Sequence, residues 1–211
     1  MLRRLISKYG RTWPVLTLAL GLGAALAALL PSGGLAWVFD REAVAGGELW
    51  RIITCHFIHV NGSHLFLDLI VFLVLGSILE VSLRKAYLIS LLAGGIAIPL
   101  GVFIFLPGLR YYCGLSGLDT AAYTLLAVHL LKTGRQQKKK MSGLIMLTAL
   151  AGLLFKIAYE IHTGTTLFAD PGTSGLIPVP LAHIIGGGIG VISGMLLFLK
   201  KSSSLTKCAF T

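Results

Sequence analysis

Long apolar stretches alternate with short polar segments along the chain. Each stretch approaches the roughly 20 residues that a helix needs to cross the hydrocarbon core of a bilayer. The pattern predicts an all-α polytopic membrane protein, with a single six-span membrane domain at residues 1–200 and a short basic tail at 201–211. The predicted spans are residues 13–31, 60–80, 86–107, 114–132, 142–160 and 180–199.

The placement of charge predicts which ends of these spans face the cytoplasm. Most of the 18 basic residues fall in the N-terminal segment, around residues 84–85, in 132–140 and in the tail. Six crossings would bring these four segments to one side of the membrane. Cytoplasmic segments carry an excess of Lys and Arg, so we expect the N- and C-termini to be cytoplasmic.

The overall composition fits a membrane protein and argues against nucleic-acid binding. The chain is 55% hydrophobic and 12% charged, with a mean hydropathy of +0.86. Its formal net charge of +10 comes largely from the predicted cytoplasmic segments, where Lys and Arg face anionic head groups. We expect a lipid bilayer around the protein and no nucleic acid among its partners.

The three cysteines do not form a recognisable ligand set. Cys55, Cys113 and Cys208 have neither the spacing of a metal site nor that of a disulfide framework. Cys55 and Cys113 both fall near the predicted outer face, where a bridge between them is one possibility and buried free thiols are the favoured one. We predict no metal and no cofactor.

A serine and a histidine are set in glycine-rich frames within the apolar stretches. Ser116 belongs to Gly114-Leu115-Ser116-Gly117, and His183 is followed by glycines at 186, 190 and 194. An ionisable side chain in hydrocarbon is costly and indicates a functional site, while small residues four apart let helices approach closely. Both residues follow an entry from the outer side, so we expect them at similar depth, as a nucleophile and its base.

Further polar residues gather in the outer half of the second span. His64 and Asp68 are four apart and share a helix face, as do Ser116 and Asp119 at a spacing of three. His56 precedes this span, and we expect it at the hydrated interface. The outer half of the membrane therefore holds most of the candidate chemistry.

In combination these motifs resemble the rhomboid intramembrane serine proteases, over about residues 48–194. A narrower resemblance, to the rhombosortase subgroup, rests on Cys113 before the serine motif and on the segment Lys156–Glu160. The resemblance implies a rhomboid-like bundle in a bacterial inner membrane, with its active site opening to the periplasmic side. The matching residues are Trp50, Arg51, His59, His64, Gly114 to Gly117, Ala182, His183, Gly186 and Gly190.

The resemblance also implies a mechanism and a substrate class. Ser116 would attack the scissile carbonyl and His183 would take its proton, with no third acid. The substrates would be membrane-anchored proteins with C-terminal transmembrane tails, in the subgroup exported proteins with Gly-Gly sorting tails. Oxyanion and supporting residues would be His64, Asp68, Gly114 and Leu115, and other cavity residues would be His59, Trp50, Arg51, Thr120, Gly186 and Gly190.

Two positions depart from the family pattern. Asp68 stands where the family has an asparagine that donates to the oxyanion, and an ionised carboxylate there would repel the developing charge. We expect Asp68 to be protonated or turned away to accept a hydrogen bond from His64. Thr120 stands where many relatives have an aromatic residue, and we expect its hydroxyl to bond a backbone carbonyl.

Three other functions fit parts of the sequence. A catalytically inactive rhomboid-like protein would bind membrane clients without cleaving them. A diaspartyl intramembrane protease would use Asp68 and Asp119 as a pair that shares one proton. A membrane cytochrome would bind haem through paired histidines, but the histidines crowd one side of the membrane.

Overall fold

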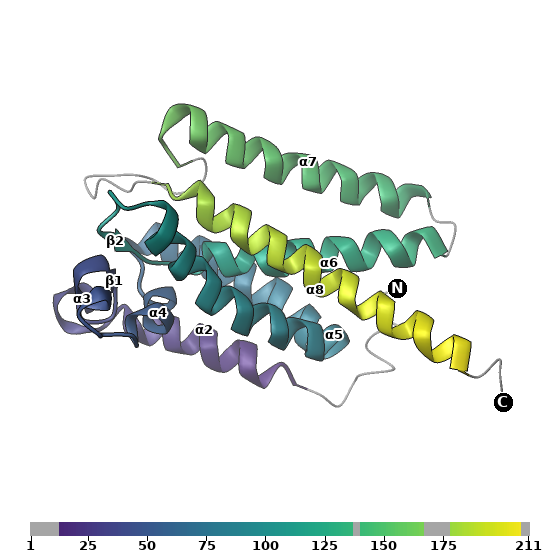
Figure 1. The fold of residues 1–211 in the computed structure, drawn as a ribbon, viewed down its shortest axis with the longest axis horizontal. Coiled ribbons are helices and arrows are strands. Elements are labelled where there is room, and N and C mark those ends of the chain that lie inside the picture. Colours follow the sequence, from purple (N-terminus) through teal and green to yellow (C-terminus); the bar gives the residue numbers. More distant parts are fainter. Residues whose placement is uncertain (1–12, 137–139, 167–177, 208–211) are drawn as a thin grey trace.

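The computed structural model describes residues 13–136, 140–166 and 178–207, and these are mostly helical (Figure 1). Each predicted span contains a helix or half of one. The long elements are α2 (Val15–Ala27), α5 (Gly62–Phe105), α6 (Ser116–Gln136), α7 (Lys140–Thr163) and α8 (Pro180–Lys207). The short ones are η1 (Pro31–Gly34), β1 (Phe39–Asp40), α3 (Arg41–Ala45), α4 (Arg51–Thr54), η2 (Cys55–Phe57) and β2 (Tyr111–Tyr112).

α5 consists of two helical halves that meet at Leu83. The backbone leaves the helical region there, with φ −138° and ψ 36°. His64 in the first half lies beside Gly114, and Ile98 in the second half lies beside the nearby Gly117. The two halves therefore run back along one another, as the predicted spans 60–80 and 86–107 require.

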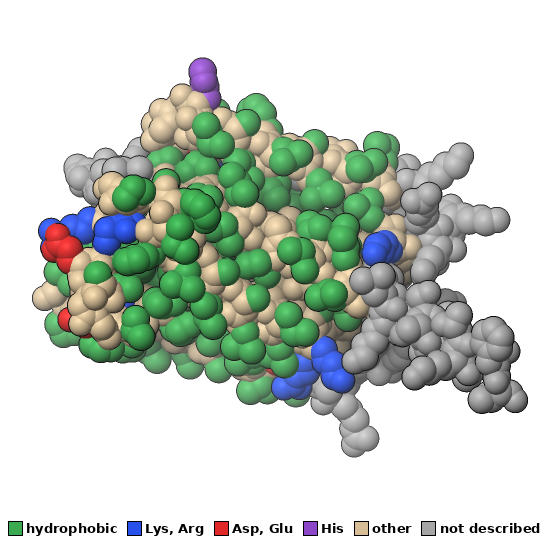
Figure 2. Space-filling view, in the orientation of Figure 1, with side chains coloured by type: hydrophobic (Ala, Val, Ile, Leu, Met, Phe, Trp, Pro, Cys, Tyr) green, Lys and Arg blue, Asp and Glu red, His purple; other side chains and the backbone are tan. Residues whose placement is uncertain are grey.

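The surface has the character of a membrane protein. α5 and residues Pro180–Leu197 of α8 are long and apolar enough to cross a membrane, judged by length and composition. Figure 2 shows hydrophobic side chains across the middle of the visible face and charged side chains toward its two ends. Such a continuous apolar surface is rare on soluble monomers and fits contact with lipid.

The glycine stripe of α8 packs against α6, as the spacing of four predicts. A Cβ added at Gly186 would meet the carbonyl oxygen of Gly117, and one at Gly190 would meet that of Ala121. Gly194 lies against Val128 further along. The absence of side chains on this face of α8 lets the two backbones touch.

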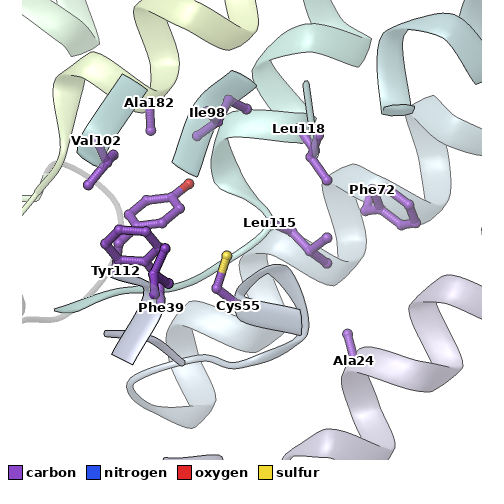
Figure 3. Packing of buried hydrophobic residues seen from close by; sticks show 11 residues of the cluster. Ala24, Phe39, Cys55, Phe72, Ile98, Val102, Tyr112, Leu115, Leu118 and Ala182 are labelled. Atoms are coloured by element: carbon purple, nitrogen blue, oxygen red, sulfur yellow. The ribbon is translucent and has the colours of Figure 1, made fainter. Parts of the chain in front are cut away.

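The segment between α2 and α5 folds over one end of the bundle. β1 pairs antiparallel with β2, joining Phe39 to Tyr112. Arg41 donates hydrogen bonds to four carbonyl oxygens at the end of α5 and just beyond, at distances of 2.6 to 3.1 Å. Figure 3 shows the cluster beneath this segment, in which Phe39 and Tyr112 lie with Cys55, Leu115 and Ala182. This cluster anchors the residues that precede α6 and begin α8.

The start of α2 is held by a buried carboxylate. Pro14 provides no side-chain cap, so the first N–H groups of α2 need another acceptor. Glu80 of α5 accepts hydrogen bonds from Leu16 N at 3.1 Å and from Thr17 N at 2.7 Å. It also accepts from Thr17 Oγ1 at 2.8 Å. Glu80 thus ties α2 to the rest of the bundle.

Candidate active site

Ser116 and His183 are brought to the same level of the bundle. Ser116 is the first residue of α6, and His183 lies in the first turn of α8. The neighbouring Gly117 packs against the carbonyl oxygen of Ala182, where a Cβ would lie 3.3 Å away. Ser116 is half-buried, whereas His183 is 5% exposed. The predicted similar depth of these two residues agrees with this arrangement.

The imidazole of His183 is engaged by α7. Its Nδ1 lies 3.2 Å from Oε2 of Glu160 and 3.2 Å from Nζ of Lys156, while Nε2 lies 3.5 Å from the same Nζ. Within the described parts of the chain, no hydrogen bond joins the Ser116 hydroxyl to the ring. Lys156 and Glu160 were not among the predicted site residues, although their segment carries part of the subgroup resemblance. Their signal was an opposite-charge pair at a spacing of four inside an apolar stretch.

The backbone before Ser116 takes a conformation that favours glycine. Gly114 has φ +113°, and a Cβ there would lie 2.9 Å from Cε1 of His64. Its N–H donates to Cys55 O at 3.0 Å. Gly114 therefore combines a left-handed turn with close contact to the span-two histidine, which supports its predicted structural role.

His56 is buried beneath this turn, so its predicted place at a hydrated interface is wrong. The residue is 3% exposed, with Nε2 3.0 Å from Gly95 O and Nδ1 3.3 Å from Gly114 O. Burial lowers the pKa of His56. The ring links α5 to the segment that leads into α6. Only packing between distant segments creates this position, and the local sequence carries no signal of it.

Asp68 is the acceptor at the centre of a polar cluster. Its Oδ2 accepts a hydrogen bond from Leu115 N at 3.1 Å and lies 3.2 Å from His59 Nε2 and 3.3 Å from His64 Nε2. The His59 and His64 rings meet edge to face, with centroids 5.1 Å apart. The carboxyl group is thus turned toward His64, which is compatible with the second of the two expected arrangements, and Leu115 supports it through its backbone.

The remaining predicted residues fall into two groups. Thr120 donates its hydroxyl hydrogen bond to Ser116 O at 2.8 Å, which confirms the expected backbone contact. Trp50 and Arg51 instead bind the 35–38 segment, through Ala36 O at 3.3 Å and through Leu35 O and Val38 O at 2.7 and 2.9 Å. Through these bonds Trp50 and Arg51 stabilise the 35–38 segment.

Cys55 and Cys113 are free thiols, so no bridge joins them, while Cys208 lies outside the described residues. Burial raises the pKa of the Cys113 thiol to about 12 and that of Cys55 as well. Neither is therefore a thiolate nucleophile at neutral pH. In the described residues, no group of three or more His, Cys, Asp or Glu side chains has an arrangement that would hold a metal ion.

One known protein family matches most of the chain. The family model described as the Rhomboid domain matches residues 46–200. The chain belongs to the rhomboid family. Rhomboids are intramembrane serine proteases, and the matched range includes both Ser116 and His183. No curated protein matches the chain.

Proposed function

We propose that this rhomboid is an active intramembrane serine endopeptidase, with Ser116 as nucleophile and His183 as general base. The observation that carries this proposal is the contact of Gly117 with Ala182 and Gly186. It joins the helix that starts at the serine to the helix turn that bears the histidine. Proximity fixed by backbone contact lowers the entropic cost of bringing two catalytic groups together.

In this mechanism the Ser116 hydroxyl attacks the scissile carbonyl while His183 takes its proton. The protonated ring then gives the proton to the leaving amine, and water releases the acyl group by the reverse sequence. The Ser116 hydroxyl makes no hydrogen bond in the described structure, so its hydrogen bond to the ring must form before attack. Catalytic hydrogen bonds commonly tighten only when substrate is bound.

The oxyanion would be stabilised by two donors. The Ser116 N–H is the first of α6 and has no partner within its helix. His64 lies against Gly114, two residues before the serine. Each donor of this kind contributes about 3 kcal/mol of transition-state stabilisation. Asp68 supports this pocket by accepting from Leu115 N, and its Oδ2 lies 3.3 Å from His64 Nε2; it takes no direct part in binding the oxyanion.

For the substrate, we propose exported proteins anchored by C-terminal transmembrane tails with a Gly-Gly motif. The support is the resemblance of Cys113 to Gly117 and of Lys156–Glu160 to the rhombosortase subgroup. The proposal includes six crossings of a bacterial inner membrane, cytoplasmic termini and an active site that opens to the periplasm. This orientation presents the site to proteins that have already been exported.

The test is cleavage in vesicles by purified wild type, Ser116→Ala and His183→Ala. Two substrates are compared: a protein with a Gly-Gly tail, and the same protein with both tail glycines changed to leucine. We expect the wild type to cut the first substrate faster and both variants to lose activity by at least 1,000-fold, on the order of a lost catalytic group.

Three results would contradict parts of this proposal. Cleavage by Ser116→Ala would exclude the serine mechanism. Equal cutting of both substrates would exclude the Gly-Gly preference but keep the protease. An uncut but tightly bound tail with the wild-type protein would favour the inactive, client-binding function, which the missing hydrogen bond between Ser116 and His183 also favours.

A further inference from the structure

The charged pair on α7 has no part in the two-residue mechanism, yet it is built against the base. We propose that Glu160 is a positioning residue that fixes the tautomer and orientation of His183, with Lys156 as its counter-ion. This inference rests on the proposed function for its catalytic meaning. Its structural content is independent of that function.

The two oxygens of Glu160 have different surroundings. Oε1 accepts a hydrogen bond from Lys156 Nζ at 2.7 Å. Oε2 is buried and makes no hydrogen bond within the described chain, although it lies 3.2 Å from His183 Nδ1. A buried carboxylate oxygen without a donor is costly, and Nδ1 is the ring nitrogen that faces it. A small rotation of the ring would turn this approach into a hydrogen bond.

The contact between Glu160 and His183 is buried, unlike a pair on the surface of a helix. The Glu160 side chain is 3% exposed and that of His183 is 7% exposed, whereas Lys156 is 20% exposed. A surface pair at a spacing of four would serve only to stabilise its helix, by a few tenths of a kcal/mol. Here the acid points inward to another helix, and the ammonium balances a carboxylate that would otherwise be isolated in an apolar region.

The contact selects the tautomer that a general base requires. When Nδ1 carries the proton and donates it to Oε2, Nε2 keeps its lone pair and can accept the proton of Ser116, provided that Lys156 Nζ, 3.5 Å from Nε2, stays bound to Glu160 Oε1. When Nδ1 instead accepts from Lys156, the proton resides on Nε2 and the ring cannot act as a base toward the serine. Glu160 also stabilises the imidazolium that forms during attack, while Lys156 opposes it.

Within the described residues, few other charged or titratable groups interact with this ring. α7 contributes Glu160 and Lys156, and α5 contributes His64, which is close enough to interact with His183. α6 faces α8 with Gly117, Ala121 and Thr124, none of which titrates. The acid and the ammonium are therefore the groups whose removal should shift the pH dependence of catalysis in opposite directions.

The experiment measures kcat and KM from pH 5 to 9 for wild type, Glu160→Gln and Lys156→Met. Glu42→Gln is a control, because that side chain is 73% exposed and belongs to α3. We expect Glu160→Gln to lower kcat about 100-fold with little change in KM, and its acidic limb to move about one unit to lower pH. Lys156→Met should move the acidic limb to higher pH.

A second readout does not depend on cleavage. The ¹⁵N chemical shifts of the His183 ring report which nitrogen carries the proton. We expect an Nδ1–H ring in the wild type, and an Nε2–H ring in Glu160→Gln because the amide can donate to Nδ1. An unchanged tautomer together with wild-type kcat and pH profile would overturn the inference. Cleavage by Ser116→Ala would overturn the proposed function, while the tautomer result would still decide the structural role of Glu160.

Discussion

Gly186 of α8 rests directly on the backbone carbonyl of Gly117 in α6, with no side chain between the two helices. This contact lies three residues after His183 and one residue after Ser116 along their helices. The spacing between nucleophile and base is therefore set by two backbones, which cannot change rotamer. Any side chain inserted at this point must move one helix relative to the other.

Gly186→Ala should separate the two helices. The new methyl group would collide with Gly117 O, and overpacking of this kind costs about 1–3 kcal/mol. We expect a lower melting temperature and a kcat reduced at least tenfold. Gly188→Ala is the matched control, because a Cβ there meets nothing within 4 Å. It should leave activity unchanged, and equal effects of the two substitutions would contradict the packing argument.

Asp68→Asn tests the carboxylate as an acceptor. Oδ2 accepts from Leu115 N and lies 3.2 Å from His59 Nε2 and 3.3 Å from His64 Nε2, and an amide supplies one oxygen and a competing donor. We expect a loss of roughly 10- to 100-fold in kcat/KM and about 1–3 kcal/mol of stability. Full activity of Asp68→Asn would show that the family's asparagine works equally well here.

Asp119→Asn is the control for that substitution, since Asp119 is also buried but its Oδ1 has no hydrogen-bond partner in the described chain. It should keep activity within about threefold, because an amide has a similar shape and no bond is lost. Loss of all cleavage in both variants would instead favour a diaspartyl protease.

His56→Ala should loosen the turn that leads into Ser116. The carbonyl oxygens of Gly95 and Gly114 would lose the imidazole nitrogens that face them. We expect the free energy of unfolding to be about 2 kcal/mol lower at pH 7.5. Burial lowers the pKa of His56 in the folded state, so below about pH 6.5 the unfolded state binds more protons. The free energy of unfolding of the wild type should therefore decrease as the pH is lowered below about 6.5. The difference in free energy of unfolding between the wild type and the variant should become smaller over the same range. Denaturant unfolding at pH 7.5 and 5.5 measures both effects.

Glu80→Gln should weaken the attachment of α2 without altering the chemistry. The carboxylate accepts from two backbone N–H groups and one hydroxyl, and the amide would place a donor against one of them. We expect about 2 kcal/mol lower stability, with kcat unchanged per folded molecule. A large fall in kcat at temperatures where the variant is fully folded would show that α2 contributes to the site.

Much of the fold could be predicted from the sequence because its periodicity is strong. The basic pair Arg84-Lys85 divides two apolar stretches, and the chain reverses at the adjacent Leu83. Glycines at a spacing of four predicted a close helix contact, although only the structure identified α6 as the partner. These features depend on order along the chain, which a sequence displays directly.

The missed contacts join residues that are far apart in the sequence. His183 is 27 positions from Lys156, and His56 is 58 positions from Gly114. Apolar residues of α7 occupy most of its faces. The sequence therefore does not indicate which face of α7 packs against α8. Trp50 and Arg51 likewise match a family motif, but the motif does not say that their bonds brace the 35–38 segment.

The hydrogen bonds from Arg41 to the end of α5 have a consequence for biosynthesis. Residues 39–41 bind partners at 102–112, so they cannot reach their final positions until about 60 to 70 further residues have left the ribosome. The segment between α2 and α5 therefore completes its contacts only after the end of α5 has been synthesised. This end of the protein is therefore assembled late. The Arg41 hydrogen bonds can form only when the end of α5 is in place.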